Sequence, residues 1–326
     1  MRVAIIGCGL IGRKRAHSVL AAGHTVVAVA DLDPDRAKAL AADTAGAVAL
    51  GDWREAIAAE IDAVIIATTH DSLATITLAA VEARRHVMVE KPAARNASEL
   101  ESVLAAVTRM GVIVKVGFNH RFHPALLKAR AIVDSGALGP LLYIRGRYGH
   151  GGRVGYDKEW RCLPEVSGGG ELIDQGSHLI DLSRWFLGDF TEVFGFAPTY
   201  FWNVSVDDNC FVGLRTATGA VAWLHASWTE WKNLFSFEIF GRDGKLQIEG
   251  LGGSYGTEKL THYQMLPEMG PPETTTWEYP FPDRSWDLEF ADFAAAIREG
   301  RRPIGDIFDA KANLDIIAKV YAGDRS

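Results

Sequence analysis

Short apolar runs alternate with helical patterns along the first third of the chain. The runs that read as strands are residues 3–6, 25–30, 63–67, 86–89 and 112–117, with Ala-rich stretches of helical periodicity between them. This alternation is typical of βαβ units, in which helices cover both faces of a parallel sheet. Pro34 and the segment Asn96 to Glu99 add helix-start signals between the strands. The pattern predicts a doubly wound α/β domain over residues 1–120.

After Gly117 the pattern changes. A polar and aromatic connector at 119–124 leads into a helical run at 125–133. Strand-like runs then follow one another across short turns, at 141–147, 208–216, 220–228, 235–240 and 245–249, before amphipathic helices at 286–299 and 307–322. Consecutive strands without helices between them indicate a mainly antiparallel sheet. Residues 121–326 are therefore predicted to form an α+β domain, with the ligand cleft between the two halves.

Composition narrows the class of protein. A length of 326 residues favours two domains, and 48% hydrophobic and 23% charged residues are ordinary for a globular protein. The net charge of −7 argues against nucleic-acid and anionic-membrane partners, since both need a basic face. Three widely spaced cysteines indicate neither a disulfide framework nor a zinc motif. With no signal-like or membrane-spanning run, we expect a cytoplasmic protein.

The glycines of the first turn carry the first chemical signal. Gly7, Gly9 and Gly12 follow the first apolar run directly, where a strand would turn into a helix near Leu10. In a dinucleotide-binding turn the first glycine allows the tight bend, the second lets a pyrophosphate approach, and the third permits close helix packing. The free N–H groups of the helix would then face the phosphates.

An acidic residue ends the second apolar run. Asp31 stands about 20 residues past the glycines, where a carboxylate accepts from a ribose 2′-hydroxyl and repels a 2′-phosphate. This favours NAD over NADP, although Arg36 leaves an opening for NADP. A glycine-rich turn without any cofactor is the simpler alternative. The candidate cofactor-binding residues at this turn and beside it are Gly7, Gly9, Leu10, Ile11, Gly12 and Asp31.

The tripeptide Glu90-Lys91-Pro92 follows the apolar run at 86–89 directly. A lysine at the carboxyl end of a strand in such a sheet points toward the cleft, where its ammonium can hold or polarise a substrate oxygen. On spacing alone, a solvated surface lysine is about as probable.

A second cluster runs from Gly168 to Asp181. If the chain is helical from Leu172, Asp174 and His178 lie one turn apart on one face. A histidine can take a hydroxyl proton as hydride leaves the same carbon, and a nearby carboxylate can orient it. An ordinary helix hydrogen bond and a metal-ligand pair are the alternatives. We expect no metal, although His120, His123 and His150 keep that alternative open.

Together these motifs resemble the glucose–fructose oxidoreductase / inositol dehydrogenase / MocA (Gfo/Idh/MocA) family. The resemblance rests on the glycine fingerprint, Asp31, Glu90-Lys91-Pro92, the connector from Gly117 through Asn119-His120-Arg121-Phe122 to Pro124, Trp160-Arg161, and Asp174 with His178. It implies a Rossmann domain, a C-terminal α+β domain whose open sheet makes dimer or tetramer contacts, and NAD(P)-dependent chemistry at a carbinol carbon of a sugar, cyclitol or related polyol.

The resemblance also implies residue roles. Lys91 would polarise the reacting oxygen, His178 would act as acid and base, and Asp174 would orient His178 or the substrate. Glu90 would approach the nicotinamide ribose, and Thr68 and Lys91 would also contact the cofactor. Arg161 would lie near the cofactor or the substrate edge. Arg121 would be a structural contact between domains. The implied substrate-binding residues are Lys91, Asn119, Trp160, Asp174 and His178.

One departure concerns the adenosine side of the cofactor. After Thr68 and Thr69 the family usually has a proline and, a few residues on, a histidine, whereas here His70-Asp71-Ser72-Leu73 follows. The leading hypothesis is an NAD-dependent dehydrogenase of a sugar, cyclitol or nucleotide-linked sugar, with the glycine-rich segment 148–153 as a candidate phosphate loop. An NAD-dependent glycosidase and a non-catalytic dinucleotide-binding sensor are the alternatives.

Overall fold

The computed structural model describes residues 1–324, which form two compact units. The first unit comprises Met1–Asn119 and Trp286–Ala312, and the second comprises His120–Ser285 and the chain from Asn313 onward. The sequence assigned everything after residue 120 to the second half. The segment Trp286–Ala312 instead belongs to the first unit, because Phe290 and Phe293 are buried in its hydrophobic core.

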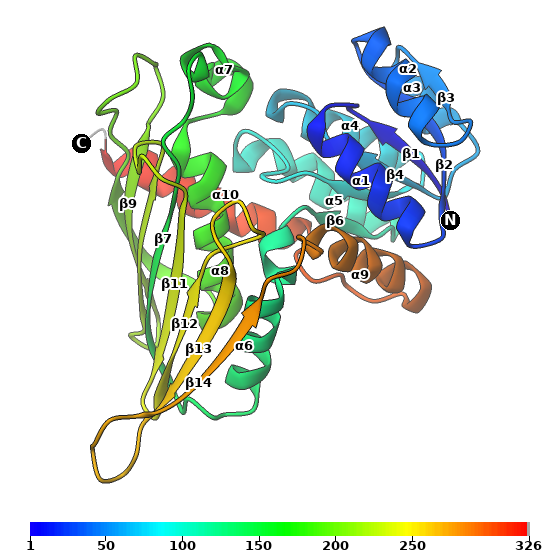
Figure 1. Cartoon of the computed structure of the whole chain (residues 1–326). Coiled ribbons are helices and arrows are strands. Elements are labelled where there is room, and N and C mark those ends of the chain that lie inside the picture. Colours follow the sequence, from blue (N-terminus) through cyan, green and yellow to red (C-terminus); the bar gives the residue numbers. More distant parts are fainter. Residues whose placement is uncertain (325–326) are drawn as a thin grey trace. The chain divides into compact units, whose positions relative to one another are not determined.

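The first unit is built on a six-stranded parallel sheet (Figure 1). In spatial order its strands are β3 (Val48–Leu50), β2 (Thr25–Ala30), β1 (Arg2–Ile6), β4 (Ala63–Ile66), β5 (His86–Val89) and β6 (Val114–Val116). Ile6 pairs with both Ala30 and Ile66, so the carboxyl ends of the central strands meet at one edge. The predicted doubly wound sheet is confirmed. Only β3 was missed, because it is a three-residue edge strand with little burial.

Helices connect these strands in turn. They are α1 (Leu10–Ala21), α2 (Pro34–Asp43), α3 (Trp53–Ala58), α4 (His70–Glu82) and α5 (Glu101–Met110). Helix α9 (Ser285–Glu299) comes from much later in the chain and packs into the core of the same unit through Phe290 and Phe293. The predicted start signals act as expected, because the Asp33 side chain caps α2 ahead of Pro34 and the Asn96 side chain accepts from the Glu99 amide. The last helix, α10 (Ile307–Asp324), begins in the first unit and continues in the second.

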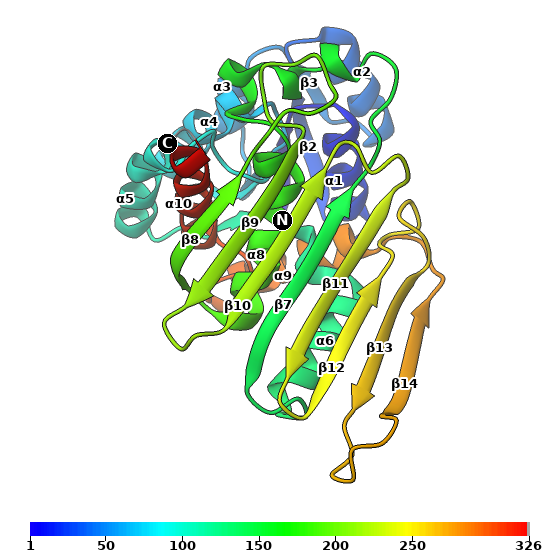
Figure 2. The same cartoon turned by 90° about the vertical axis from the view of Figure 1, so that its left-hand side faces the viewer.

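The second unit contains an eight-stranded sheet (Figure 2). In spatial order its strands are β14 (Glu273–Tyr279), β13 (Glu258–Gln264), β12 (Gly244–Glu249), β11 (Leu234–Gly241), β7 (Leu141–Gly149), β10 (Val221–Ser227), β9 (Asn209–Thr216) and β8 (Phe190–Phe196). Strands β7 and β10 pair in parallel and all other neighbours are antiparallel. The mainly antiparallel sheet is therefore as predicted.

The two faces of this sheet differ. Along β10, Ala222, Leu224 and Ala226 are buried while Trp223 between them is half-exposed. The buried face packs against α6 (Pro124–Asp134) and α8 (Ser177–Leu187). Figure 2 looks onto the opposite face, which no helix of the described residues covers.

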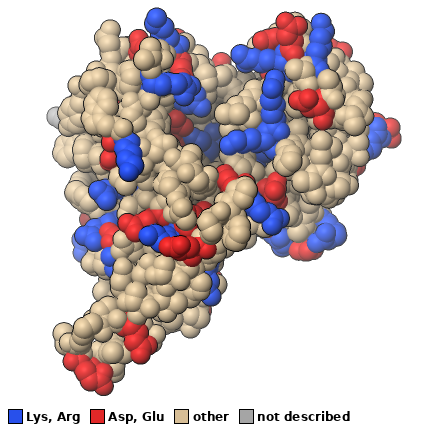
Figure 3. Space-filling model, in the orientation of Figure 1, with Lys and Arg blue, Asp and Glu red and all other residues tan. Residues whose placement is uncertain are grey.

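Charge is mixed over the surface. On the face drawn in Figure 3, basic and acidic side chains are interspersed. The loop between β13 and β14 carries the exposed Glu268, and the exposed Glu273 begins β14. Across residues 1–324, no helix has both the length and the apolar character to cross a bilayer.

Candidate functional site

Of the three glycines in the turn after β1, Gly9 has room for a side chain, whereas Gly7 and Gly12 do not. Gly7 has φ +93°, and a Cβ there would lie 2.4 Å from the Ala67 carbonyl oxygen. A Cβ on Gly12 would lie 1.9 Å from the carbonyl oxygen of Gly7. A Cβ on Gly9, by contrast, would meet nothing within 4 Å. Gly7 and Gly12 are thus required by the protein's own packing, whereas Gly9 leaves open space at the N-cap of α1.

Asp31 is fixed beside this turn. Its Oδ2 accepts a 2.7 Å hydrogen bond from the Cys8 amide, and its Oδ1 accepts from the Asp33 amide at 2.9 Å. Burial, and then the charge of Asp31, raise the pKa of the Cys8 thiol to about 12, so the thiol stays neutral. Each carboxylate oxygen has further acceptor capacity for a hydroxyl. Open space at Gly9, a helix N-terminus and a fixed carboxylate are the features that a dinucleotide requires, and these residues fit one.

The other predicted cofactor residues of the first unit lie at the same edge of the sheet. Thr68 follows β4, and its amide nitrogen would be 2.9 Å from a Cβ on Gly7. Its hydroxyl accepts from Ser72 at 2.8 Å. Glu90 and Lys91 follow β5, where the Glu90 amide donates to the Ile66 carbonyl at 2.9 Å. Parallel pairing of β1, β4 and β5 thus brings together residues that are far apart in sequence.

In the second unit, Asp174 and His178 lie on successive turns of different helix types. The chain forms a π-helical turn over Leu172–Gly176 before α8 begins at Ser177, where the sequence predicted one continuous α-helix. A π-turn widens the helix locally and is common at functional sites. Leu172, Leu179 and Leu182 are fully buried, as expected.

Asp207 holds the start of this π-turn. Its carboxylate accepts from the amides of Gly170 and Leu172 at 2.9 and 2.7 Å and from the Tyr321 hydroxyl at 2.8 Å. Burial nevertheless raises the pKa of Asp207 to about 6. A Cβ on Gly170 would lie 1.9 Å from the Asp207 carbonyl oxygen, so this glycine is needed for the close approach.

Arg161 is bound to Asp174. Its Nε lies 3.3 Å from Asp174 Oδ2 and its Nη1 lies 3.2 Å from Glu159 Oε2. Burial alone would lower the pKa of Arg161, but the neighbouring negative charges, with Asp174 first among them, raise it. The guanidinium also stacks over the Trp160 ring, with 4.8 Å to its centroid. Three of the residues that the resemblance singled out therefore form one contact group.

Histidine and tyrosine rings surround His178. The His120 imidazole stacks on that of His178 with 3.7 Å between centroids and 19° between planes. Tyr148 meets His178 edge-on at 6.3 Å. Burial, and then the neighbouring Tyr255, raise the pKa of Tyr148 well above 10, so its hydroxyl stays protonated. The Tyr255 hydroxyl in turn accepts from Gln175 at 3.0 Å.

Contacts of Tyr148, Tyr255 and His120 with the Asp174–His178 region were not predicted from the sequence, in which Tyr148 stood only at the start of the candidate phosphate loop. His120 lay within the connector motif and was considered as a metal ligand, but neither signal predicts that its ring stacks on that of His178. The tyrosines come from β7 and from the turn after β12, and no sequence spacing connects either of them to His178.

Several other expectations concern residues around this group. Asn119 opens the 3₁₀ turn at Asn119–Phe122 that follows β6. Arg121 forms a bidentate ion pair with Asp181 within the second unit, at 2.6 and 2.8 Å.

In the candidate phosphate loop, Arg153 pairs with Glu159 at 2.5 Å, so this basic charge is already balanced. Among the described residues, no three His, Cys, Asp or Glu side chains are grouped so as to hold a metal ion.

Family models match both halves of the chain. Residues 1–118 match the model described as an oxidoreductase family with an NAD-binding Rossmann fold, and residues 126–247 match the GFO/IDH/MocA C-terminal domain. Levoglucosan dehydrogenase of Pseudarthrobacter phenanthrenivorans is 28% identical over 285 residues, covering 76% of this chain and 73% of the relative. The NAD⁺-dependent scyllo-inositol 2-dehydrogenase of Bacillus subtilis is 27% identical, covering 97% of this chain and 92% of the relative.

The fold has a close match among solved structures. A structure of levoglucosan dehydrogenase in complex with NADH has a TM-score of 0.90 and 25% sequence identity, covering all of this chain and 97% of that one. The shared fold extends over both units.

Proposed function

The chain belongs to the Gfo/Idh/MocA family of NAD-binding oxidoreductases, and from this premise we propose that it transfers a hydride between nicotinamide and a CH–OH carbon of a sugar or cyclitol. The observation that carries the proposal is the edge of the parallel sheet, where Gly9 leaves open space beside the fixed Asp31 carboxylate, and where Lys91 follows strand β5 of the same sheet. The substrate class follows the names of relatives such as levoglucosan and scyllo-inositol dehydrogenases.

NAD, when bound, supplies the acceptor for the hydride. The residues that would hold it are Gly7, Gly9, Leu10, Ile11, Gly12, Asp31, Thr68, Glu90 and Arg161. Lys91 would bind the substrate oxygen and stabilise its developing negative charge, while the His178 imidazole takes the hydroxyl proton. Asp174, paired with Arg161, would orient the substrate, and Asn119 and Trp160 would contact it.

Within the substrate class, an uncharged polyol is favoured over a nucleotide-linked sugar. The segment 148–153 was the candidate for holding a phosphate, and its Arg153 is paired with Glu159. The His150 side chain in the same segment accepts from the Gly152 amide at 2.9 Å, and burial lowers the pKa of His150. Neither basic group is therefore available as an unbalanced positive charge for a phosphate.

An assay of a polyol panel with NAD tests the proposal. We expect turnover by the wild type and a loss of about 10²- to 10⁴-fold in kcat/KM for Lys91→Met and for His178→Asn, since each removes a group acting in proton transfer or charge stabilisation. Lys319→Met and His17→Asn are matched controls at exposed positions and should keep full activity. Unchanged turnover in both test variants would remove the proposed roles. Release of free sugar without net NADH would instead favour a glycosidase.

We also propose that the open face of the eight-stranded sheet joins copies of this chain into a homo-oligomer. Phe194, Phe196 and Trp223 share this face and are 56%, 62% and 51% exposed. Contiguous exposed aromatic surface of this kind marks an interaction site. Light scattering of the wild type should give a dimer or tetramer mass, and Trp223→Glu should lower it. A monomeric wild type would contradict this proposal.

A further inference from the structure

Arg15 joins two carboxylates in the interior of the first unit. It lies on α1, and its side chain is completely buried. Its Nε donates to Glu90 Oε1 at 2.7 Å, its Nη2 lies 2.6 Å from the same oxygen, and its Nη1 donates to Glu289 Oε2 at 2.6 Å. Burial alone would lower the pKa of Arg15, but the charges of Glu90 and Glu289 raise it. A permanent cation therefore connects the end of β5 to helix α9.

The end of β6 is shaped around this ion pair. Gly117 has no side chain, and a Cβ there would lie 2.8 Å from Arg15 Nη2 and 2.8 Å from Glu90 Oε2. Both distances are shorter than any real Cβ contact, so a larger residue would displace the pair. The absence of a side chain at Gly117 thus leaves the space that the Arg15–Glu90 pair occupies.

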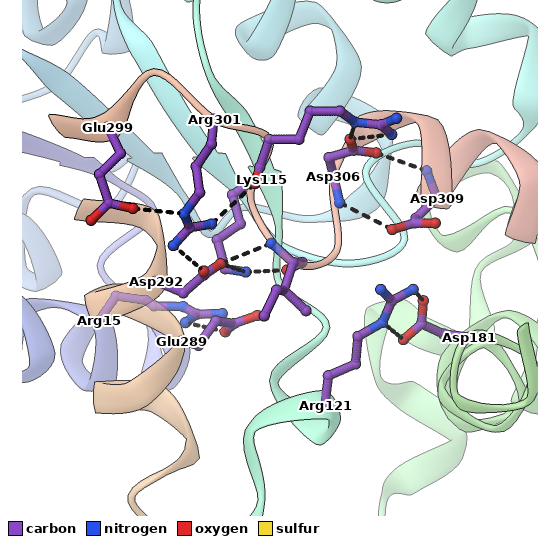
Figure 4. A network of polar contacts seen from close by, with 12 residues as sticks. Arg15, Lys115, Arg121, Asp181, Glu289, Asp292, Glu299, Arg301, Asp306 and Asp309 are labelled. Carbon is purple, nitrogen blue, oxygen red and sulfur yellow. Dashed lines mark hydrogen bonds and ion pairs between the residues drawn. The ribbon is translucent and has the colours of Figure 1, made fainter. Parts of the chain in front are cut away.

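Helix α9 has another anchor that does not touch Glu90. Lys115 binds Asp292 at 3.1 Å, and Arg301 Nη2 donates to the other oxygen of Asp292 at 2.8 Å (Figure 4). Glu289 lies one turn before Asp292 on the same helix. The Asp292 contacts already attach α9 to the sheet, so the bond from Arg15 to Glu289 adds a connection between this helix and Glu90 in particular.

We propose that Arg15 and Glu289 are positioning residues for the reaction. They act through Glu90, whose carboxylate they fix, and through it on the backbone that presents Lys91. This inference rests on the proposed function, in which Glu90 approaches the nicotinamide ribose and Lys91 binds the substrate oxygen. The planar guanidinium suits the task because it bridges two carboxylates with fixed geometry, which a lysine ammonium does not do. Misplacement of a reacting group by about 1 Å can cost 10²-fold in rate.

Three variants test the inference from different sides. Arg15→Lys keeps the positive charge and removes the fork, Glu289→Gln removes the carboxylate on α9, and Gly117→Ala displaces the Arg15–Glu90 pair without removing any charge. For each we expect kcat to fall at least about 10-fold and the NADH dissociation constant, measured by fluorescence titration, to rise at least about threefold. The substrate KM should change less than kcat, because the side chains that contact the substrate, Lys91 included, are all retained in these variants.

Arg301→Gln is the matched control. It weakens the Asp292 anchor of the same helix, so its melting temperature should fall while kcat and the NADH dissociation constant stay within about twofold of wild type. Wild-type kcat and NADH affinity in Arg15→Lys, with only a lower melting temperature, would show that the network serves stability alone. If Arg15→Lys does not fold, Glu289→Gln and Gly117→Ala decide by the same criterion.

The two proposals fail in different ways. A wild type that turns over no polyol would overturn the proposed dehydrogenase function, but NADH titration of the variants would still measure whether Arg15 positions Glu90. If the wild type turns over a polyol and the Arg15, Glu289 and Gly117 variants keep its kcat and NADH dissociation constant, the positioning role is overturned and the proposed function stands.

Discussion

The two glycines Gly9 and Gly12 should respond in opposite ways to the same added methyl group. Gly9 has φ −72° and ψ −165°, which alanine adopts without strain, and its Cβ would enter space free of protein atoms within 4 Å. Gly12 has no such space, because its Cβ would lie 1.9 Å from the Gly7 carbonyl oxygen. If Gly9 is open because a pyrophosphate approaches it, Gly9→Ala should impair cofactor binding without harming the fold.

The expected magnitudes follow from these distances. At Gly9, alanine restricts the unfolded chain and should stabilise the protein by about 0.4–1 kcal/mol, or roughly 1–4 °C in melting temperature. The methyl group holds the phosphate away from the backbone, so we expect the NADH dissociation constant to rise at least about 10-fold, or about 1.4 kcal/mol. At Gly12 the two atoms must separate by at least about 1 Å, and such overpacking costs about 1–3 kcal/mol or more.

Thermal melts without cofactor and NADH fluorescence titrations on both variants separate these effects. Gly9→Ala should melt at or slightly above the wild-type temperature and bind NADH weakly. Gly12→Ala should melt several degrees lower even without cofactor. Wild-type NADH affinity in Gly9→Ala would refute the assignment of this open space to the cofactor, and a lower melting temperature for Gly9→Ala would refute the packing argument.

Three further predictions concern other residues of the two units. Asp31→Ser removes the carboxylate that repels a 2′-phosphate, so the ratio of the NADPH to the NADH dissociation constant should fall at least about 10-fold; an unchanged ratio would contradict its role. His120→Ala removes the ring stacked on His178, and kcat/KM should fall about 10-fold while NADH affinity is retained, which steady-state kinetics and titration would check together. Burial raises the pKa of Asp207 from 3.8 to about 6, so the folded protein holds this proton more tightly than the unfolded chain. The resulting contribution of Asp207 to the free energy of unfolding is fully present below pH 4 and is lost as the pH rises through 6. In urea unfolding, the stability difference between wild type and Asp207→Asn should therefore shrink by up to about 3 kcal/mol from pH 4 to pH 7, and a constant difference would be inconsistent with this shift.

Most strands of the parallel sheet could be predicted from the sequence, because they are buried on both faces and therefore form continuous apolar runs. The sequence did not predict three strands of the eight-stranded sheet, which are the edge strands β8 and β14 and the neighbouring strand β13. Strand β14 (Glu273–Tyr279) has no buried position, and β8 has only one, so neither has the periodicity of a buried strand. Their positions follow from pairing with inner strands and not from their own composition.

The part of the candidate site that lies at the edge of the parallel sheet could be predicted from the sequence. Gly9, Asp31 and Lys91 each follow a parallel strand, so their spacing along the chain predicts a shared edge. Arg15 and Glu289 are 274 residues apart, and no local pattern indicates that one binds the other. The stacking of His120 on His178 likewise depends on tertiary packing, since the two residues lie on separate elements of the second unit.

The most direct test is a comparison of single-turnover hydride transfer in Lys91→Met, His178→Asn and the double variant, using a polyol that the wild type oxidises. If both side chains serve the same alcohol oxygen, each single variant should lose about 10²- to 10⁴-fold in rate. The double variant should then be little slower than the slower single variant, because the two groups act as a unit. Losses that multiply in the double variant, or a wild-type rate in either single variant, would contradict the account.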